Sequence, residues 1–464
     1  MRARLVESPI VRRAAAIAWT FAALAMAGTS AGRAAELSEA GRWLRGYLRI
    51  DTRNPPGNEE QAAAYLAALL HREGIATELL VTPEGRTSLS ARLSATPPSG
   101  GALVLLHHMD VVAPGEGWRV APFGGELRDG RLYGRGALDC KSLGIAHLAA
   151  LVELARRRVP LRRDVVLVAV ADEERGGLRG SGWLLAHHPE LFTGAVAVLN
   201  EGGSARQVNG RLLWWEIEVA QKRPLWLRVG ASGRGGHAAI VNPQSAVHEL
   251  VSGLARLLAI PPRYRVSPPV RAYLAALAPL QNDHWRRMFA DLDTAIAPEG
   301  PRVGLLPGMA GLFLDTLQVT VLRGSEQINV IPEEASAEID YRLLPDTDDE
   351  AVLEAARTAL GARLAVDVLL RAPPSAASPA SGDAWEAIVR AFGGEAPVVP
   401  AFKSGFTDSR FFRELGIPAY GLTPFALEPQ DLRGIHGLDE NIPTAELDRG
   451  VQRMRDLVLA LASR

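Results

Sequence analysis

A chain of 464 residues is long enough for about two domains. Its 47% hydrophobic and 22% charged residues are typical of a globular protein, and a net charge of -1 at pH 7 excludes the strongly basic surface that attracts nucleic acid. The single cysteine, Cys140, excludes an internal disulfide, so the fold depends on core packing and on metal where metal is bound.

The first residues have the pattern of a secretory signal peptide. Arginines precede an apolar run at residues 14–27, and small residues around Thr29-Ser30-Ala31 follow it. The run is shorter than the roughly 20 apolar residues of a membrane span. We therefore expect residues 1–35 to be a signal peptide and the protein to be exported, as a periplasmic or secreted protein. Membrane attachment is expected only if this segment remains uncleaved.

Beyond the leader, the hydrophobic spacing alternates between helix and strand. Residues 37–50 and 59–73 have helical spacing and flank the breaker Asn54-Pro55-Pro56-Gly57. Apolar runs typical of buried strands follow, with helical stretches between them; the strands are expected at 103–106, 165–170 and 195–199, and the helices at 142–157 and 181–187. Strands that alternate with helices predict an α/β fold whose central sheet is mostly parallel and flanked by helices.

The pattern changes near residue 212. Strands are predicted at 213–220, 224–229, 318–322, 335–343 and 365–370, and helices at 245–258 and 349–360, which together predict an inserted β-α-β-β-α-β unit. Residues 260–311, rich in proline and apolar helix formers, are expected to form a helical excursion within it. The proline-rich segment 373–379 is expected to link the inserted unit back to the first domain. The predicted divisions are a signal peptide at 1–35, a discontinuous catalytic domain at 36–212 and 372–464, and the inserted domain at 213–371.

Five clusters of carboxylates and histidines lie along the chain. Each of the first four ends or follows an apolar run, so all four are expected at one edge of the sheet. Taken singly, each has a plain structural interpretation, such as a core histidine, a helix N-cap or a solvated acidic loop. The clusters are His108-Met109-Asp110, Asp139-Cys140-Lys141, Asp172-Glu173-Glu174, Asn200-Glu201-Gly202 and Gly434-Ile435-His436.

Their residue types suit a site for two metal ions. On a strand, His108 and Asp110 share a face, so Asp110 is expected to orient the imidazole and His107 to point into the fold. Asp139 follows a glycine-rich turn, where a short carboxylate can span two ions about 3.5–4 Å apart. Glu173 and Glu174 point in opposite directions on extended backbone, so one binds metal and the other handles protons. Two histidines with three carboxylates suit paired zinc ions.

The sequence resembles the co-catalytic zinc exopeptidases, which include aminoacylases, glutamate carboxypeptidases and succinyl-diaminopimelate desuccinylases. The resemblance extends from about Leu37 to the end of the chain. It is most similar to the larger branch, which contains vacuolar carboxypeptidase and secreted N-fatty-acyl-amino-acid hydrolases. The stretches that carry it are His107-His108-Met109-Asp110-Val111-Val112, Gly134-Arg135-Gly136-Ala137-Leu138-Asp139-Cys140-Lys141, Asp172-Glu173-Glu174-Arg175-Gly176-Gly177 and Asn200-Glu201-Gly202-Gly203.

The resemblance implies a role for each clustered residue. His108 and Glu201 would hold one Zn²⁺ and Glu174 and His436 the second, with Asp139 between the two ions. Co²⁺ or Mn²⁺ are expected substitutes. Glu173 would be the general base, and Asp110 would orient His108.

The inserted unit matches the family's lid or dimerisation domain. The resemblance implies that His237 reaches the active site of a neighbouring subunit and stabilises the oxyanion, so a homodimer is expected. Arg342 and Asn329 would contact the substrate's carboxylate and the reacting oxygen. Gly405 and Thr407 match the substrate-facing loop of the catalytic domain.

Two residues within the clusters depart from the family pattern. Many relatives have aspartate at the position of Asn200, so one zinc ion would be held poorly if that residue, and not Glu201, were the ligand. Cys140 replaces a second acidic residue and is expected to be a small hydrophobe near the site. The resemblance also implies a cis peptide bond after Asp139.

We therefore expect a two-domain metallohydrolase that cleaves an amide bond next to a free carboxylate by attack of a zinc-bridged hydroxide, with Glu173 shuttling the proton. The substrate is a small peptide, as for a carboxypeptidase or dipeptidase, or an N-acyl amino acid, as for an aminoacylase. The sequence leaves these two open. A metal-containing binding protein without catalysis is the alternative from a different class, and the presence of Glu173 argues against it.

Overall fold

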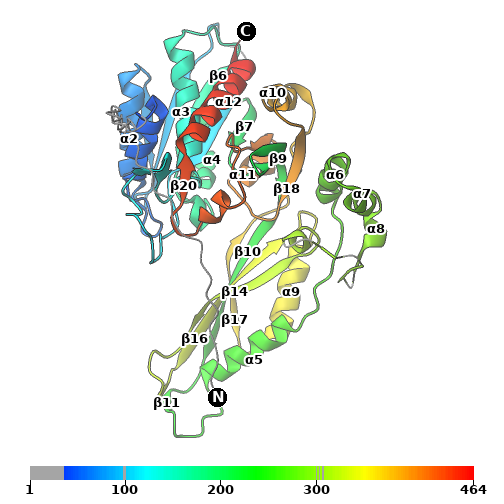
Figure 1. Ribbon diagram of the computed structural model, residues 1–464. Coiled ribbons are helices and arrows are strands. Elements are labelled where there is room, and N and C mark those ends of the chain that lie inside the picture. The colour runs from blue at the N-terminus through cyan, green and yellow to red at the C-terminus, as the bar shows by residue number, and fades with distance from the viewer. Residues whose placement is uncertain (1–35, 98–100, 299, 303, 306–307, 464) are drawn as a thin grey trace, which may run out of the picture. The chain divides into compact units, whose positions relative to one another are not determined.

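The computed structural model of the protein describes residues 36–97, 101–298, 300–302, 304–305 and 308–463 (Figure 1). The signal peptide predicted for residues 1–35 lies outside the described residues and remains a prediction. Within the described part, no helix combines the length and apolar character needed to cross a membrane.

Nine strands form a mixed main sheet whose central strands are parallel. Their order is β1-β2-β6-β3-β7-β19-β9-β18, with β8 paired to β9. β3 runs parallel to β6 and β7, β19 runs parallel to β7, and β18 runs parallel to β9. The bounds are β1 Thr77–Val81, β2 Thr87–Leu93, β3 Ala102–His108, β6 Asp164–Val170, β7 Ala195–Asn200, β8 Ser204–Val208, β9 Arg211–Gln221, β18 Val398–Lys403 and β19 Ala419–Gly421.

Helices cover both faces of this sheet, because alternate residues of its strands point to opposite sides. Leu103 and Leu105 of β3 belong to a core shared with α1 (Glu39–Leu48), α2 (Glu59–Arg72), α3 (Lys141–Arg156), α10 (Gly382–Gly393) and α12 (Thr444–Ala462). Val104 and Leu106 belong to a core shared with α4 (Ser181–His187) and α11 (Ser409–Glu414). The expected α/β architecture with a mostly parallel centre is therefore confirmed.

A separate antiparallel sheet follows in the order β14-β16-β10-β17. It is built from β10 (Arg223–Ser232), β14 (Thr316–Arg323), β16 (Glu334–Leu343) and β17 (Ala365–Arg371), and α5 (Ala246–Leu258) and α9 (Asp349–Leu360) share its core. In chain order these elements read β-α-β-β-α-β, as predicted. We call this unit the lid domain.

One strand of the prediction belongs elsewhere. The strand expected at 213–220 is predicted to belong to the inserted unit, but it is part of β9, which pairs with β18 and β8 in the main sheet. The lid sheet therefore begins only at Arg223, after β9 has left the main sheet at Gln221. The sequence could not show this, because β9 and β10 are separated by Lys222 alone and both have strand periodicity.

The excursion at 260–311 is helical, as expected, but it packs on the main sheet. It contains α6 (Pro268–Leu277), α7 (Asp283–Ala290) and α8 (Leu292–Ala295), followed by the short strands β12 (Ile296–Ala297) and β13 (Gly300–Pro301). Val270 and Leu274 of α6 share a core with Ala220 of β9 and Phe402 of β18. The excursion therefore covers the edge of the main sheet next to β18.

Three smaller sheets complete the described structure, one of which pairs β12 with β13. β4 (Glu126–Arg128), β5 (Arg131–Tyr133) and β20 (Asn441–Pro443) bring the C-terminal segment beside the turn that carries Asp139. In the lid domain, β11 (Gly236–His237) pairs with β15 (Val330–Ile331).

Candidate metal centre

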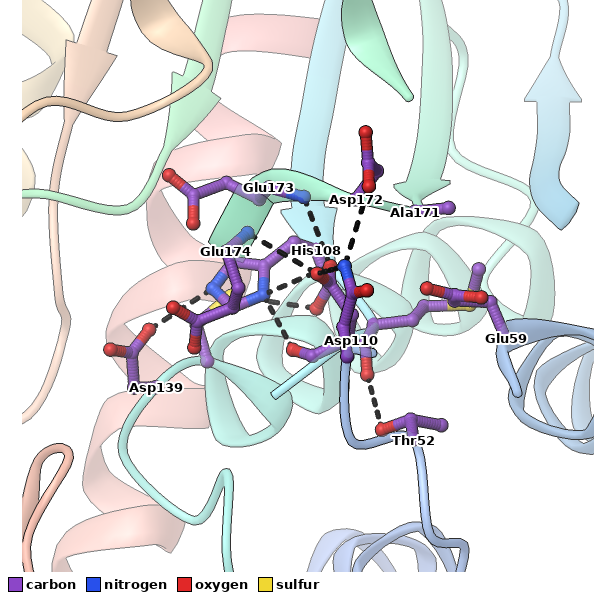
Figure 2. Close-up of polar contacts among 12 residues, drawn as sticks. Thr52, Glu59, His108, Asp110, Asp139, Ala171, Asp172, Glu173 and Glu174 are labelled. Atoms are coloured by element: carbon purple, nitrogen blue, oxygen red, sulfur yellow. Dashed lines mark hydrogen bonds and ion pairs between the residues drawn. The ribbon is translucent and has the colours of Figure 1, made fainter. Parts of the chain in front are cut away.

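The predicted metal ligands meet at one edge of the main sheet. Figure 2 labels three of them, His108, Asp139 and Glu174. β3 ends at His108, β7 ends one residue before Glu201, and the short 3-10 helix η1 (Glu173–Arg175) follows β6. Because β3 pairs in parallel with both β6 and β7, the carboxyl ends of the three strands lie together. Asp139 arrives just before α3, and His436 follows the 3-10 helix η5 (Asp431–Gly434).

Asp139 joins the two histidines. Its Oδ1 lies 3.0 Å from Nε2 of His108, and its Oδ2 lies 3.1 Å from Nε2 of His436. Glu201 approaches His108 at 3.7 Å, and Glu174 approaches His436 at 3.3 Å. The two carboxylate oxygens of Asp139 therefore serve different histidines, which is the geometry required of a ligand between two ions.

Two groups of donor atoms are compact enough to hold a metal ion each. One contains His108, Cys140 and Glu201, the other Asp139, Glu174 and His436, and within each group the donor atoms lie within 4.8 Å of one another. Three carboxylates and two histidines match the preferences of zinc and similar divalent ions. The donor set and its spacing thus fit a pair of ions.

The electrostatics of the centre also favour the binding of cations. Burial raises the pKa of Glu201 to about 8, and burial likewise raises the pKa of Glu174. Hydrogen bonds to Asp139 and Glu174 raise the pKa of His436 to about 10. Crowded buried carboxylates favour any positive charge that enters, whether a proton or a metal ion.

These shifts predict how metal binding depends on pH. A raised pKa in the folded state means that the metal-free centre keeps protons, which a metal must displace. The protonated groups stabilise the folded state fully below their unfolded pKa values. This stabilisation is lost as pH rises through the folded pKa values, about 8 for Glu201 and about 10 for His436. We expect the difference in Tm between zinc-loaded and chelated protein to grow as pH rises from 6 to 8.5. Differential scanning calorimetry measures it, and a difference that shrinks over this range would contradict the assignment.

Asp110 orients His108 in a way that differs from the prediction. The imidazole Nδ1 lies 2.8 Å from the main-chain oxygen of Asp110, whereas the nearest carboxylate oxygen is 3.7 Å away. The carboxylate instead accepts hydrogen bonds from the backbone N–H groups of Glu173 and Glu174, at 3.1 and 3.2 Å, and from the Asn54 amide at 2.8 Å. The Asp110 side chain therefore positions the glutamates, and its backbone carbonyl positions the histidine.

Glu173 and Glu174 stand on a 3-10 turn and not on extended backbone, but their side chains still diverge (Figure 2). Glu174 reaches His436, and it also accepts a hydrogen bond from the Val112 N–H at 3.2 Å. Among the described residues, no hydrogen bond or ion pair holds the carboxylate of Glu173. Burial, followed by the nearby charge of Glu201, raises the pKa of Glu173. Glu173 is therefore available to exchange protons with a bound molecule.

A buried ion network behind this turn was not predicted. Asp172 accepts a hydrogen bond from Arg86 at 2.7 Å and caps the Arg179 N–H at 3.1 Å, and Arg86 also pairs with Glu59. Arg86 lies on the loop before β2, without any motif to mark it. Only its burial beside two carboxylates identifies it as part of the support for η1.

Glu440 is the second residue that the sequence analysis missed. Its buried carboxylate accepts hydrogen bonds from the N–H groups of Gly136, Leu138 and Asp139, at 2.8, 2.7 and 3.1 Å, and pairs with Arg135 at 2.8 Å. It thereby holds the turn that presents Asp139, whose peptide bond to Cys140 is cis.

Replacing Glu440 by glutamine should therefore weaken metal binding without removing a ligand. Loss of a residue that holds a metal ligand in place costs about 10- to 100-fold in metal affinity. The charge of buried Arg135 would also lose its partner, which is expected to lower the free energy of unfolding by about 3–5 kcal/mol. Zinc titration and thermal unfolding measure the two effects. The exposed Glu60→Gln is a matched control that removes the same charge elsewhere. Equal zinc affinity in both variants would contradict the role of Glu440.

The departures from the family pattern at Asn200 and Cys140 have structural explanations. The amide of Asn200 points away from the cluster and donates to Ser409 Oγ at 3.1 Å, so Glu201 is the residue of this pair that faces His108. Cys140 is buried, with its Sγ 3.6 Å from the His108 carbonyl, and burial raises the pKa of its thiol to about 12. A thiol in this state is a small neutral neighbour and no nucleophile.

The predicted lid residues do not join the cluster in the described chain. His237 is exposed on β11, and Asn329 is exposed next to it, where its carbonyl accepts the Ala238 N–H at 3.1 Å. Arg342 pairs with Asp340 at 2.8 Å, and its guanidinium lies 4.4 Å from the ring centre of Phe406, which belongs to the loop 404–408. The lid sheet and the catalytic loop thus meet at Arg342.

Residues 404–408 have mixed roles. Apart from Gly405 itself and its two chain neighbours, no heavy atom of the described residues lies within 4 Å of where a Cβ would stand, so this position is open. The hydroxyl of Thr407 donates to Gln221 at 3.1 Å and accepts the Ser409 N–H at 3.2 Å. Thr407 therefore fixes the loop, and Gly405 leaves room beside it.

The chain matches the model of Peptidase family M20/M25/M40 over residues 104–460. It is 26% identical over 428 residues to aminoacylase-1 of Pongo abelii, with 90% of this chain and 94% of that protein covered. It is 28% identical over 372 residues to the N-fatty-acyl-amino acid synthase/hydrolase PM20D1 of Bos taurus, with 75% and 72% covered.

Solved structures show the same fold. The M20 family metallo-carboxypeptidase Sso-CP2 from Sulfolobus solfataricus superposes with a TM-score of 0.68 at 19% identity, covering 92% of this chain and 99% of that one. Human carnosine dipeptidase 1 gives a TM-score of 0.66 at 16% identity, covering 91% and 95%. The match to the family model spans most of the chain and includes every residue of the cluster. The chain therefore belongs to Peptidase family M20/M25/M40 and, with it, to the metallohydrolases.

Proposed function

We propose that this protein uses two zinc ions to hydrolyse an amide bond next to a free carboxylate. The observation that carries the proposal is the position of Asp139 between His108 and His436, together with the carboxylate of Glu173, which pairs with no other described side chain. His108 and Glu201 would hold one ion, and Glu174 and His436 the other. Metal ions bound there would polarise the scissile carbonyl and lower the pKa of water toward about 7.

The protein's own groups supply the remaining steps. The carboxylate of Glu173 has no hydrogen bond or ion pair with any residue that the structure describes, and Glu173 is 8% exposed, so it can take a proton from the attacking water and pass it to the leaving nitrogen. Burial raises the pKa of this carboxyl group above its usual range, which makes the carboxylate a stronger proton acceptor. Arg342 would bind the substrate's carboxylate, and the open position at Gly405 would leave space for the substrate backbone.

Two further parts of the proposal concern assembly and location. His237 would stabilise the oxyanion in a neighbouring subunit, so we propose a homodimer formed through the lid domain; its exposure on β11 supports this. Sedimentation equilibrium tests it. We also propose export, on the pattern of residues 1–35.

The substrate is either a small peptide or an N-acyl amino acid. Aminoacylase-1 and the N-fatty-acyl-amino acid hydrolase are among the relatives, and the carboxypeptidase and the dipeptidase share the fold. Mass spectrometry of products from a mixed panel of dipeptides and N-acyl amino acids, with zinc-loaded enzyme, tests the function. Cleavage that disappears with Glu173→Ala supports it, and no cleavage despite two bound ions would refute it.

A further inference from the structure

A cavity of about 330 Å³ adjoins the metal centre. Asp139, Cys140 and Glu201 form the part of its wall that belongs to the centre. Most of the remaining wall is apolar and comes from the start of α3 and from the loops before α12. These apolar side chains are Leu138, Leu143, Phe425, Leu427, Leu432 and Ile435.

The cavity is suited to one side of the scissile amide. Arg342, the cation that would bind the substrate's free carboxylate, does not line it. A substrate that places its carbonyl carbon at the metals and its carboxylate at Arg342 therefore leaves this cavity for its acyl group. Apolar walls favour an aliphatic chain, because removing apolar surface from water stabilises the bound state.

Lys403 is the one positively charged side chain among the residues that line the cavity in the described chain. Its ammonium is fixed by Ser204 Oγ and by Glu216 Oε2, both at 2.9 Å. Glu216 is held in turn by the Tyr273 hydroxyl of α6 at 2.9 Å and by the Trp214 indole at 3.1 Å. A cation held in the wall by so many contacts disfavours an acyl group that carries its own positive charge.

We propose that this cavity receives the acyl group of an N-acyl amino acid, an uncharged aliphatic chain of medium length; the proposal rests on the amide hydrolysis proposed above. Its volume lies near the lower end of small-molecule sites, which span about 300–1,000 Å³, and so favours a medium chain over a long fatty one. Lys403 excludes acyl groups with a cationic end.

The test compares N-acetyl-, N-hexanoyl- and N-palmitoyl-leucine with zinc-loaded full-length enzyme. We expect the highest kcat/KM for the hexanoyl substrate, at least about tenfold above acetyl, since each buried methylene changes an equilibrium about fourfold. Thr423→Phe, which fills the cavity, should bring the hexanoyl-to-acetyl ratio close to one. The exposed Thr193→Phe adds the same side chain elsewhere and should keep the wild-type ratio. An acetyl preference, or a hexanoyl preference that survives in folded Thr423→Phe, would overturn the proposal.

A second variant tests Lys403 and covers the case in which Thr423→Phe does not fold. Lys403→Met combined with Glu216→Gln removes both charges of the pair, so no buried charge is left unpaired. Wild-type enzyme should prefer hexanoyl-leucine over 6-aminohexanoyl-leucine at least about tenfold, and the double variant should narrow this ratio several-fold. An unchanged ratio would overturn the role of Lys403.

Calorimetric binding of hexanoate separates the two proposals, because it needs no turnover. If wild-type protein binds hexanoate and Thr423→Phe does not, the cavity assignment holds even where no amide is cleaved, and only the proposed hydrolysis fails. If amides are cleaved but both proteins bind hexanoate equally, the cavity assignment fails and the hydrolysis stands.

Discussion

Replacing Glu173 by glutamine is expected to lower kcat by about 10²- to 10⁴-fold, the usual contribution of a general base, while both metal ions remain bound. The side chain keeps its size, and no described hydrogen bond or ion pair is lost. Only the ability to accept a proton disappears. Steady-state kinetics and metal analysis of the same sample measure the two effects.

The neighbouring residue provides the matched control. Glu174→Gln changes the same chemical group one position along η1, but this carboxylate lies 3.3 Å from His436. It should reduce metal content as well as activity. The assignment of roles would be reversed if Glu173→Gln lost metal and Glu174→Gln kept it.

Replacing Asp139 by asparagine should disrupt both halves of the centre. Its two carboxylate oxygens serve different histidines, and an amide presents only one oxygen to them. Metal affinity should fall by more than the roughly 10- to 100-fold that loss of an outer-shell partner costs. We expect fewer than one ion per chain after dialysis, with no measurable hydrolysis.

Plasma mass spectrometry counts the ions, and thermal unfolding gives an independent measure, since the stabilisation by bound metal disappears with it. Asp164→Asn serves as control, because Asp164 lies at the end of β6 that is far from the centre, where it pairs with Arg92 of β2. Two ions retained in Asp139→Asn would show that this residue does not join the two sites.

The sequence correctly predicted that ligands gather at one edge of the sheet, because this grouping requires only that the strands be recognised and run parallel. Apolar runs marked β3, β6 and β7, and parallel strands necessarily end at one edge, so His108 and Glu201 could be placed together. His436 came from the resemblance, because nothing in its own segment fixes where a glycine-flanked loop folds.

The supporting residues could not be predicted in the same way. The backbone N–H groups of η1 bind the carboxylate of Asp110, so its carbonyl is left to orient His108. The sequence analysis expected extended backbone here, which would not have offered these N–H groups. Arg86 and Glu440 act through hydrogen bonds to segments far away in the chain. Their types occur widely on protein surfaces, and only burial distinguishes them.

The position of Glu440 has a consequence for how the enzyme is made. His436 and Glu440 lie four residues apart, so the segment that supplies the last ligand also supplies the anchor of the turn that bears Asp139. A chain emerging from the ribosome at about 5–20 residues per second has completed most of its main sheet before either residue appears. The nascent protein therefore lacks both the last ligand and the anchor of the Asp139 turn until residues 436–440 are synthesised.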